Sequence, residues 1–174
     1  MPQCILSGHR GAVNLKKKIC MVGQFAVGKT SLVRRFVDQI YDDRYLATVG
    51  VKIDRKDVSV GSSPLTLMLW DLAGEDDLEQ LKVSHLRGAS GYILVADGCR
   101  AASLAKAGEL HKRISGQLGE LPFVLALNKA DLRDQWEFSR AAASEPGWPV
   151  FETSAKTGAG VEEMFAALAE KLIA

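Results

Sequence analysis

A glycine-rich stretch, GQFAVGKT at residues 23–30, lies between a short apolar run and an amphipathic pattern. The apolar run, ICMVG at 19–23, has the length and composition of a strand that is buried on both faces of a parallel sheet. After the stretch, apolar side chains recur at helical spacing: Leu32, Val33, Phe36, Val37 and Ile40. A strand, a tight glycine loop and a helix in this order bring several backbone N–H groups and the positive end of a helix to one point. The arrangement predicts an α/β fold with a phosphate-binding loop.

The rest of the chain repeats this alternation of buried strands and amphipathic helices. Apolar runs recur at 92–98 and 123–128, and helical patterns cover 101–119 and 161–172. The segment 51–70 differs, because only the turn cluster GSSP separates its two halves, which predicts an antiparallel hairpin. We therefore expect a doubly wound α/β domain with a mostly parallel six-stranded sheet and one antiparallel edge strand.

The sequence predicts one domain over residues 16–174, after a leader at 1–15 that we expect to be flexible. We interpret the lysines at 16–18 as solvated charge before the first strand. The net charge of +1 gives no reason to expect nucleic acid as a partner. Three cysteines without metal-ligand spacing favour a reducing cytoplasmic location. No apolar run has the length of a membrane span, and the final residues KLIA contain no cysteine for a prenyl group, so we expect no lipid anchor.

The glycine-rich loop supplies the first candidate site residues. Lys29 offers a positive charge to the β- and γ-phosphates of a nucleotide, and the hydroxyl of Thr30 is a candidate ligand for Mg²⁺. Backbone N–H groups of the loop and of the first helical turn can point at the β-phosphate. The residues that provide these groups are Ala26, Val27, Gly28, Lys29, Thr30 and Ser31.

A second motif, WDLAGE at 70–75, comes at the end of the next long strand. Asp71 is placed to hold Mg²⁺ through a water molecule, and Gly74 leaves its backbone N–H free to meet a γ-phosphate. Thr48, in the polar stretch between the first helix and the hairpin, can complete the metal shell when a γ-phosphate is present. These three residues predict a loop that is ordered by the triphosphate and released by the diphosphate.

Two further motifs, NKAD at 128–131 and ETSAK at 152–156, predict that the base is guanine. Asp131 can accept hydrogen bonds from N1–H and the 2-amino group of guanine, whereas adenine offers neither donor. Asn128 can tie this loop to the phosphate loop. Four further residues complete the predicted base site. The long side chains of Lys129 and Lys156 would cover the two faces of the base. Ser154 and Ala155 would present a backbone N–H to guanine O6. A phosphotransferase for small molecules, the alternative reading of the phosphate loop, gives no role to these two motifs.

Together these motifs resemble the Ras superfamily of small GTPases, over residues 16–173. The resemblance implies a P-loop NTPase G domain that cycles between GTP and GDP with Mg²⁺. It also implies effector, exchange-factor and activator proteins that contact two switch segments, here 38–50 and 74–86. Tyr41 lies seven residues before Thr48, as in the Rab branch, and would stack near the guanine. The ending AVGKT of the phosphate loop is similar to the Rho branch.

Two departures from the family pattern bear on catalysis. Glu75 stands where most relatives carry a glutamine that positions the attacking water, and Phe25 replaces a glycine where an activator's arginine would enter. We expect Glu75 and Lys29 to be the catalytic residues of a slow GTPase that acts as a switch. The alternative is a GTP-bound interaction module with negligible hydrolysis. The nucleotide bound to the purified protein would distinguish the two hypotheses.

Overall fold

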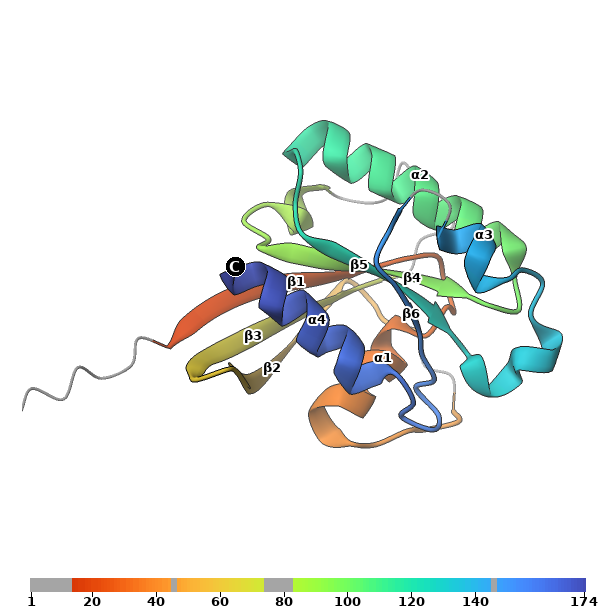
Figure 1. The fold of residues 1–174 in the computed structure, drawn as a ribbon, viewed down its shortest axis with the longest axis horizontal. Helices are drawn as coiled ribbons and strands as arrows, with labels where there is room; N and C mark the ends of the chain where they lie inside the picture. The colour runs from red at the N-terminus through yellow and green to blue at the C-terminus, as the bar shows by residue number, and fades with distance from the viewer. Residues whose placement is uncertain (1–13, 45–46, 74–82, 145–146) are drawn as a thin grey trace, which may run out of the picture.

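The computed structural model describes residues 14–44, 47–73, 83–144 and 147–174, and its centre is one six-stranded sheet (Figure 1). The strand order is β2-β3-β1-β4-β5-β6. Only the β2–β3 pair is antiparallel, and the other pairs are parallel. The strands are β1 (Leu15–Val22), β2 (Val51–Val60), β3 (Ser63–Leu72), β4 (Gly91–Asp97), β5 (Phe123–Asn128) and β6 (Val150–Glu152).

Helices cover both faces of this sheet (Figure 1). On one face α1 (Lys29–Asp38) and α4 (Val161–Ile173) pack through apolar side chains, with the rings of Phe36 and Phe165 stacked 3.9 Å apart. On the other face lie α2 (Ala101–Leu118) and the short α3 (Arg140–Ser144). Two 3₁₀ segments complete the described elements, η2 (Val83–Leu86) and η3 (Ala130–Gln135). The predicted doubly wound α/β fold with one antiparallel edge strand is confirmed.

The predicted hairpin is present, and its turn is tighter than the sequence suggested. Ser63 and Pro64 belong to β3 and pair with Val60 and Ser59, so only two residues, 61–62, connect the strands. Gly61 has a positive φ of 58°, which two-residue hairpin turns require. The antiparallel strand β2 therefore forms one edge of the sheet, as expected.

The interpretation of residues 16–18 as charge before the first strand was wrong, because β1 already begins at Leu15. Leu15 pairs with Leu65, and the lysines continue the same parallel register along β3. Their long stems allow this, since a lysine can lay its methylenes on apolar surface and keep its ammonium in water. Lys18 differs in its ammonium, whose Nζ lies 3.6 Å from the ring centroid of Trp70 and donates a hydrogen bond to the carbonyl of Arg87 at 2.9 Å. The predicted domain start at 16 thus falls one residue inside β1, and residues 1–13 of the predicted leader lie outside the described part of the chain.

No helix among the described residues combines the length and the apolar character that crossing a membrane requires. Cys20 is fully buried in β1, and Cys20 and Cys99 are both free thiols.

Candidate functional site

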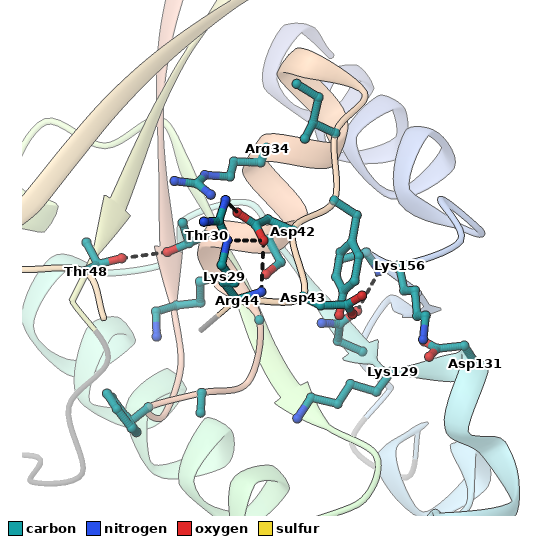
Figure 2. Close-up of a pocket in the computed structure, with 18 of the residues that line it drawn as sticks. Lys29, Thr30, Arg34, Asp42, Asp43, Arg44, Thr48, Lys129, Asp131 and Lys156 are labelled. Atoms are coloured by element: carbon teal, nitrogen blue, oxygen red, sulfur yellow. Dashed lines mark hydrogen bonds and ion pairs between the residues drawn. The ribbon is translucent and has the colours of Figure 1, made fainter. Parts of the chain in front are cut away.

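Polar side chains gather at the edge of the sheet where the parallel strands end. Asp71, Asp97 and Asn128 stand at the carboxyl ends of β3, β4 and β5, and each is buried. In doubly wound sheets this edge is the usual place for a ligand, because loops from neighbouring strands diverge there. A pocket of about 280 Å³ opens at this edge (Figure 2). Buried polar groups beside a cavity mark it as the candidate site.

The loop between β1 and α1 forms one wall of the pocket. Gly28 precedes the helix with a φ of 102°, and a Cβ there would lie 2.2 Å from Nδ2 of Asn128, so glycine is needed for two reasons. Ala26 also has a positive φ of 60°, which is unusual for a residue with a side chain. Lys29 folds back over the loop and its Nζ donates hydrogen bonds to the carbonyls of Gly23 and Gln24. The first turn of α1 thus directs its N–H groups and a buried ammonium into one concave loop.

Thr30, Thr48 and Asp71 meet at one end of the pocket, although they come from three separate segments. Figure 2 shows the bond between the two threonines. The hydroxyl oxygens of Thr30 and Thr48 lie 2.6 Å apart, and Thr30 Oγ1 donates to Asp71 Oδ2 at 2.6 Å. The other oxygen, Asp71 Oδ1, is buried and has no hydrogen-bond partner among the described residues. Burial raises the pKa of this carboxyl, and hydrogen bonds from the two threonines and the charge of Lys29 oppose the rise. Hydroxyl and carboxylate oxygens are ligands that Mg²⁺ accepts, so this donor set fits the ion.

Asn128 connects the two halves of the pocket. Its Nδ2 donates to the carbonyl of Val27 in the phosphate loop at 3.0 Å. Its Oδ1 accepts from Thr153 Oγ1 at 3.2 Å and from the backbone N–H of Ala155 at 3.3 Å. One buried amide therefore fixes the phosphate loop against both of the later motifs.

The opposite end of the pocket carries the carboxylate of Asp131 and two lysines (Figure 2). Asp131 Oδ1 accepts a hydrogen bond from Ser154 Oγ at 2.6 Å. Lys129 and Lys156 line the pocket beside it. Arg35 of α1 donates to the carbonyls of residues 155 and 156, which holds this loop against the first helix. This end of the pocket therefore presents one oriented carboxylate oxygen beside the apolar stems of two lysines.

The segment after α1 closes the pocket from outside. Tyr41 lines the wall on the side of Asp131, and burial, followed by the charges of Asp43 and Asp131, raises the pKa of its hydroxyl. Asp42 accepts hydrogen bonds from the backbone N–H and the guanidinium of Arg44, and these bonds lower its pKa. This segment adds both aromatic surface and charge to the entrance.

The structure brings most of the sequence-predicted residues to the pocket wall: Ala26, Gly28, Lys29, Thr30, Ser31, Tyr41, Thr48, Asn128, Lys129, Asp131, Ala155 and Lys156. Val27, Asp71 and Ser154 lie just behind the wall and bond to residues that form it. Gly74 and Glu75 lie outside the described residues. Sequence reasoning did not assign seven further lining residues to the site: Arg34, Ile40, Asp42, Asp43, Arg44, Leu72 and Leu132. The run YDDR was expected to belong to a switch segment, with Tyr41 near the guanine, but the side chains of Asp42, Asp43 and Arg44 were not assigned to the pocket.

Comparison with known proteins points to one family. Residues 18–174 match the sequence model of the Ras family. The GTP-binding protein ypt5 of Schizosaccharomyces pombe is 35% identical over 94% of this chain and 81% of its own length. The Ras-related protein Rab5 of Nicotiana tabacum is 35% identical over 91% of this chain and 82% of its own, and RABD2c of Arabidopsis thaliana is 34% identical over 87% and 77%. The matched residues include the whole wall of the pocket.

Proposed function

Because this chain belongs to the Ras family, we propose that it is a guanine-nucleotide switch that binds GTP and GDP with Mg²⁺ and hydrolyses GTP slowly. One observation carries the proposal. A single cavity joins the phosphate loop, the cluster of Thr30, Thr48 and Asp71, and the oriented carboxylate of Asp131. These three features match the phosphates, the bound metal ion and the base of one nucleotide.

At the phosphate end, we assign the loop 26–31 to binding the β-phosphate through its backbone N–H groups. The ammonium of Lys29 already faces this loop, where it can neutralise charge on β- and γ-phosphates. Bound Mg²⁺ would supply further neutralisation of that charge. Thr30 and Thr48 would hold the ion directly and Asp71 through water. The buried oxygen of Asp71 that has no hydrogen-bond partner in the described part of the chain supports this assignment.

At the base end, we assign Asp131 to the recognition of guanine. Its Oδ1 is oriented by Ser154, which leaves its remaining acceptor sites for N1–H and the 2-amino group. The stems of Lys129 and Lys156 would cover the two faces of the base, with Tyr41 stacking nearby. The N–H of Ala155 would meet guanine O6. A site that hydrogen-bonds a substrate group in this way rejects the analogue that lacks it by roughly 10⁴-fold or more.

Switching would arise from contacts made only in the triphosphate state. Thr48 and Gly74 would reach toward the γ-phosphate, and loss of that group would release both segments. We therefore propose that effectors, exchange factors and activators read residues 38–50 and 74–86. We propose a cytoplasmic place of action, in keeping with the free thiols of Cys20 and Cys99.

A second candidate function is a GTP-bound interaction module without turnover. Phe25 favours it, because this ring is 38% exposed, lines the pocket and would obstruct an arginine inserted by an activator. Glu75 in place of glutamine favours it as well, because an ionised glutamate cannot donate a hydrogen bond to the transferring group.

Competition between nucleotides tests the proposed function. The parent protein should bind GDP and GTP in the presence of Mg²⁺, and excess ATP should not displace them. Asp131→Asn replaces one acceptor by a donor, so the preference should move toward xanthine nucleotides, which carry an acceptor at that edge. Asp134→Asn, in the same 3₁₀ segment, is the matched control and should keep the parent's preference. Tight ATP binding by the parent, or an unchanged guanine preference in Asp131→Asn, would contradict the assignment.

A further inference from the structure

The loop between β4 and α2 carries a buried carboxylate that the proposed function has not used. Asp97 ends β4, and its side chain is 2% exposed. Its Oδ1 accepts the backbone N–H of Cys99 at 3.0 Å. Its Oδ2 accepts from Lys129 Nζ at 2.6 Å and from Arg100 Nε at 3.1 Å. A buried carboxylate with this many donors is a fixed point in the structure.

Arg100 extends from this fixed point to the phosphate loop. Its Nη2 donates to the carbonyl oxygen of Phe25 at 2.8 Å, while its Nε remains on Asp97. A guanidinium is planar and holds its donors in a rigid fork, so the two bonds fix the position of one acceptor relative to the other. Arg100 is not among the described residues that line the pocket, and it therefore acts from behind the wall.

The direction of the Phe25 carbonyl determines the direction of the next N–H group. The peptide between Phe25 and Ala26 is planar and trans, since the described residues contain no cis bond. When the carbonyl of Phe25 points at Arg100, the N–H of Ala26 must point the opposite way. Ala26 lines the pocket, and its positive φ of 60° is a conformation that a residue with a side chain adopts only when its surroundings impose it. The bond from Arg100 is one such constraint.

We propose that Arg100 is a positioning residue of the nucleotide site. By bridging Asp97 and the Phe25 carbonyl, it keeps the N–H of Ala26 directed at the β-phosphate and slows release of the nucleotide. The inference rests on the proposed binding of guanine nucleotide. It also joins the two ends of the site, because the carboxylate that holds Arg100 holds Lys129 as well.

A plain surface ion pair is the competing explanation, and the contacts argue against it. Exposed pairs contribute little because both partners stay hydrated. Here only the guanidinium is partly exposed, at 38%, and the carboxylate is buried. The second acceptor, moreover, lies 75 residues earlier in the chain. Arg100 thus connects the loop after β4 to the phosphate loop and is more than a surface charge at the start of α2.

Release and affinity measurements on Arg100→Gln test the proposal. We expect a fluorescent GDP analogue to leave Arg100→Gln about tenfold faster than the parent, the effect of losing a hydrogen bond from a charged donor. Affinity for GMP should stay within about twofold, because GMP keeps the base but lacks the β-phosphate. Arg113→Gln removes the same charge from α2, roughly 20 Å beyond Arg100 at the start of that helix, and should behave as the parent. Arg100→Lys keeps the charge without the fork and should resemble Arg100→Gln.

Three outcomes would overturn the role of Arg100. An unchanged GDP release rate would mean that the loop holds its shape without the bridge. Equal losses of GDP and GMP affinity would indicate general loosening of the fold, which circular dichroism of each variant would also reveal. Full recovery in Arg100→Lys would assign the effect to charge rather than to bridging. Failure of the parent to bind any guanine nucleotide would instead contradict the proposed function, and it is seen before the variants are compared.

Discussion

At the scale of single residues, the cost of burying a charge decides where the metal would bind. Asp71 is fully buried, and burial raises its pKa because the charged form loses its hydration. The hydroxyl of Thr30 donates a hydrogen bond to Oδ2 of Asp71, which replaces part of the lost hydration. Oδ1 has no hydrogen-bond partner among the described residues. Such a group weakens the fold in the absence of a cation and gains from its presence. This balance is what the proposed metal-binding role of Asp71 predicts.

Asp71→Asn should separate these two effects. The amide oxygen can still accept from Thr30, so we expect metal-free protein to melt at the same temperature or a few degrees higher; about 1 kcal/mol corresponds to roughly 2–4 °C for a chain of this size. The rise in melting temperature that Mg²⁺ and GDP give the parent should shrink, because the charge that attracts the ion is gone. Thermal melts with and without Mg²⁺ and GDP check this. Asp57→Asn is the matched control, since Asp57 also accepts from a threonine but is exposed on β2. An undiminished response in Asp71→Asn would exclude Asp71 from the metal site.

At the scale of elements, α2 is held on the sheet by an aromatic cluster that includes a histidine. The ring of His111 lies 4.4 Å from that of Phe123 and 4.7 Å from that of Trp148, measured between centroids. A hydrogen bond of 2.8 Å joins His111 Nδ1 to the hydroxyl of Tyr92. Burial lowers the pKa of His111, and the nearby Glu120 opposes this only in part.

This lowered pKa predicts a pH dependence of stability. Below about pH 6.5 the unfolded chain takes up the proton more readily than the native one, so the free energy of unfolding falls as the pH drops from there toward the native pKa. Between pH 7.5 and 5.5 the melting temperature of the parent should therefore fall more than that of His111→Gln. Glutamine retains a polar partner for Tyr92 but does not titrate. Melts of both proteins at several pH values measure the difference, and parallel curves would show that His111 carries no such linkage.

The elements also show which parts of this molecule a sequence can predict. Buried parallel strands are continuous apolar runs, so β4 and β5 were found from pattern alone, as was the NKAD loop that follows β5. Lys16, Lys17 and Lys18 break that pattern, and their place in β1 depends on pairing with β3, which is a tertiary contact. The same holds for the pocket. The motifs predicted most of the residues that line it, whereas Arg100 reaches Phe25 only because two loops fold together.

At the scale of the whole molecule, a switch requires that the two nucleotide states differ and that one converts into the other. The pocket wall includes the segment after α1, with Tyr41 and Thr48, so loss of a phosphate contact there would alter the surface that partners meet. Conversion depends on residues around the attacking water. If Phe25, which lines the pocket, obstructs an activator's arginine as proposed, turnover would have to come from groups of this chain.

Glu75→Ala tests whether this chain supplies the catalysis itself. Glu75 lies outside the described residues, and its predicted role follows from its place in WDLAGE. A glutamate can accept a hydrogen bond from the attacking water, or take its proton if neighbouring phosphate charge raises its pKa. A positioned acid–base group raises a reaction rate by about 10²–10⁴-fold. We therefore expect single-turnover hydrolysis to slow by at least about tenfold in Glu75→Ala. The parent should correspondingly be purified mostly with GDP, and Glu75→Ala with a larger share of GTP. Chromatography of the released nucleotide, together with single-turnover rates, measures both. Equal rates near zero and bound GTP in both proteins would favour the static interaction module, because a molecule that keeps its triphosphate does not complete the cycle on its own.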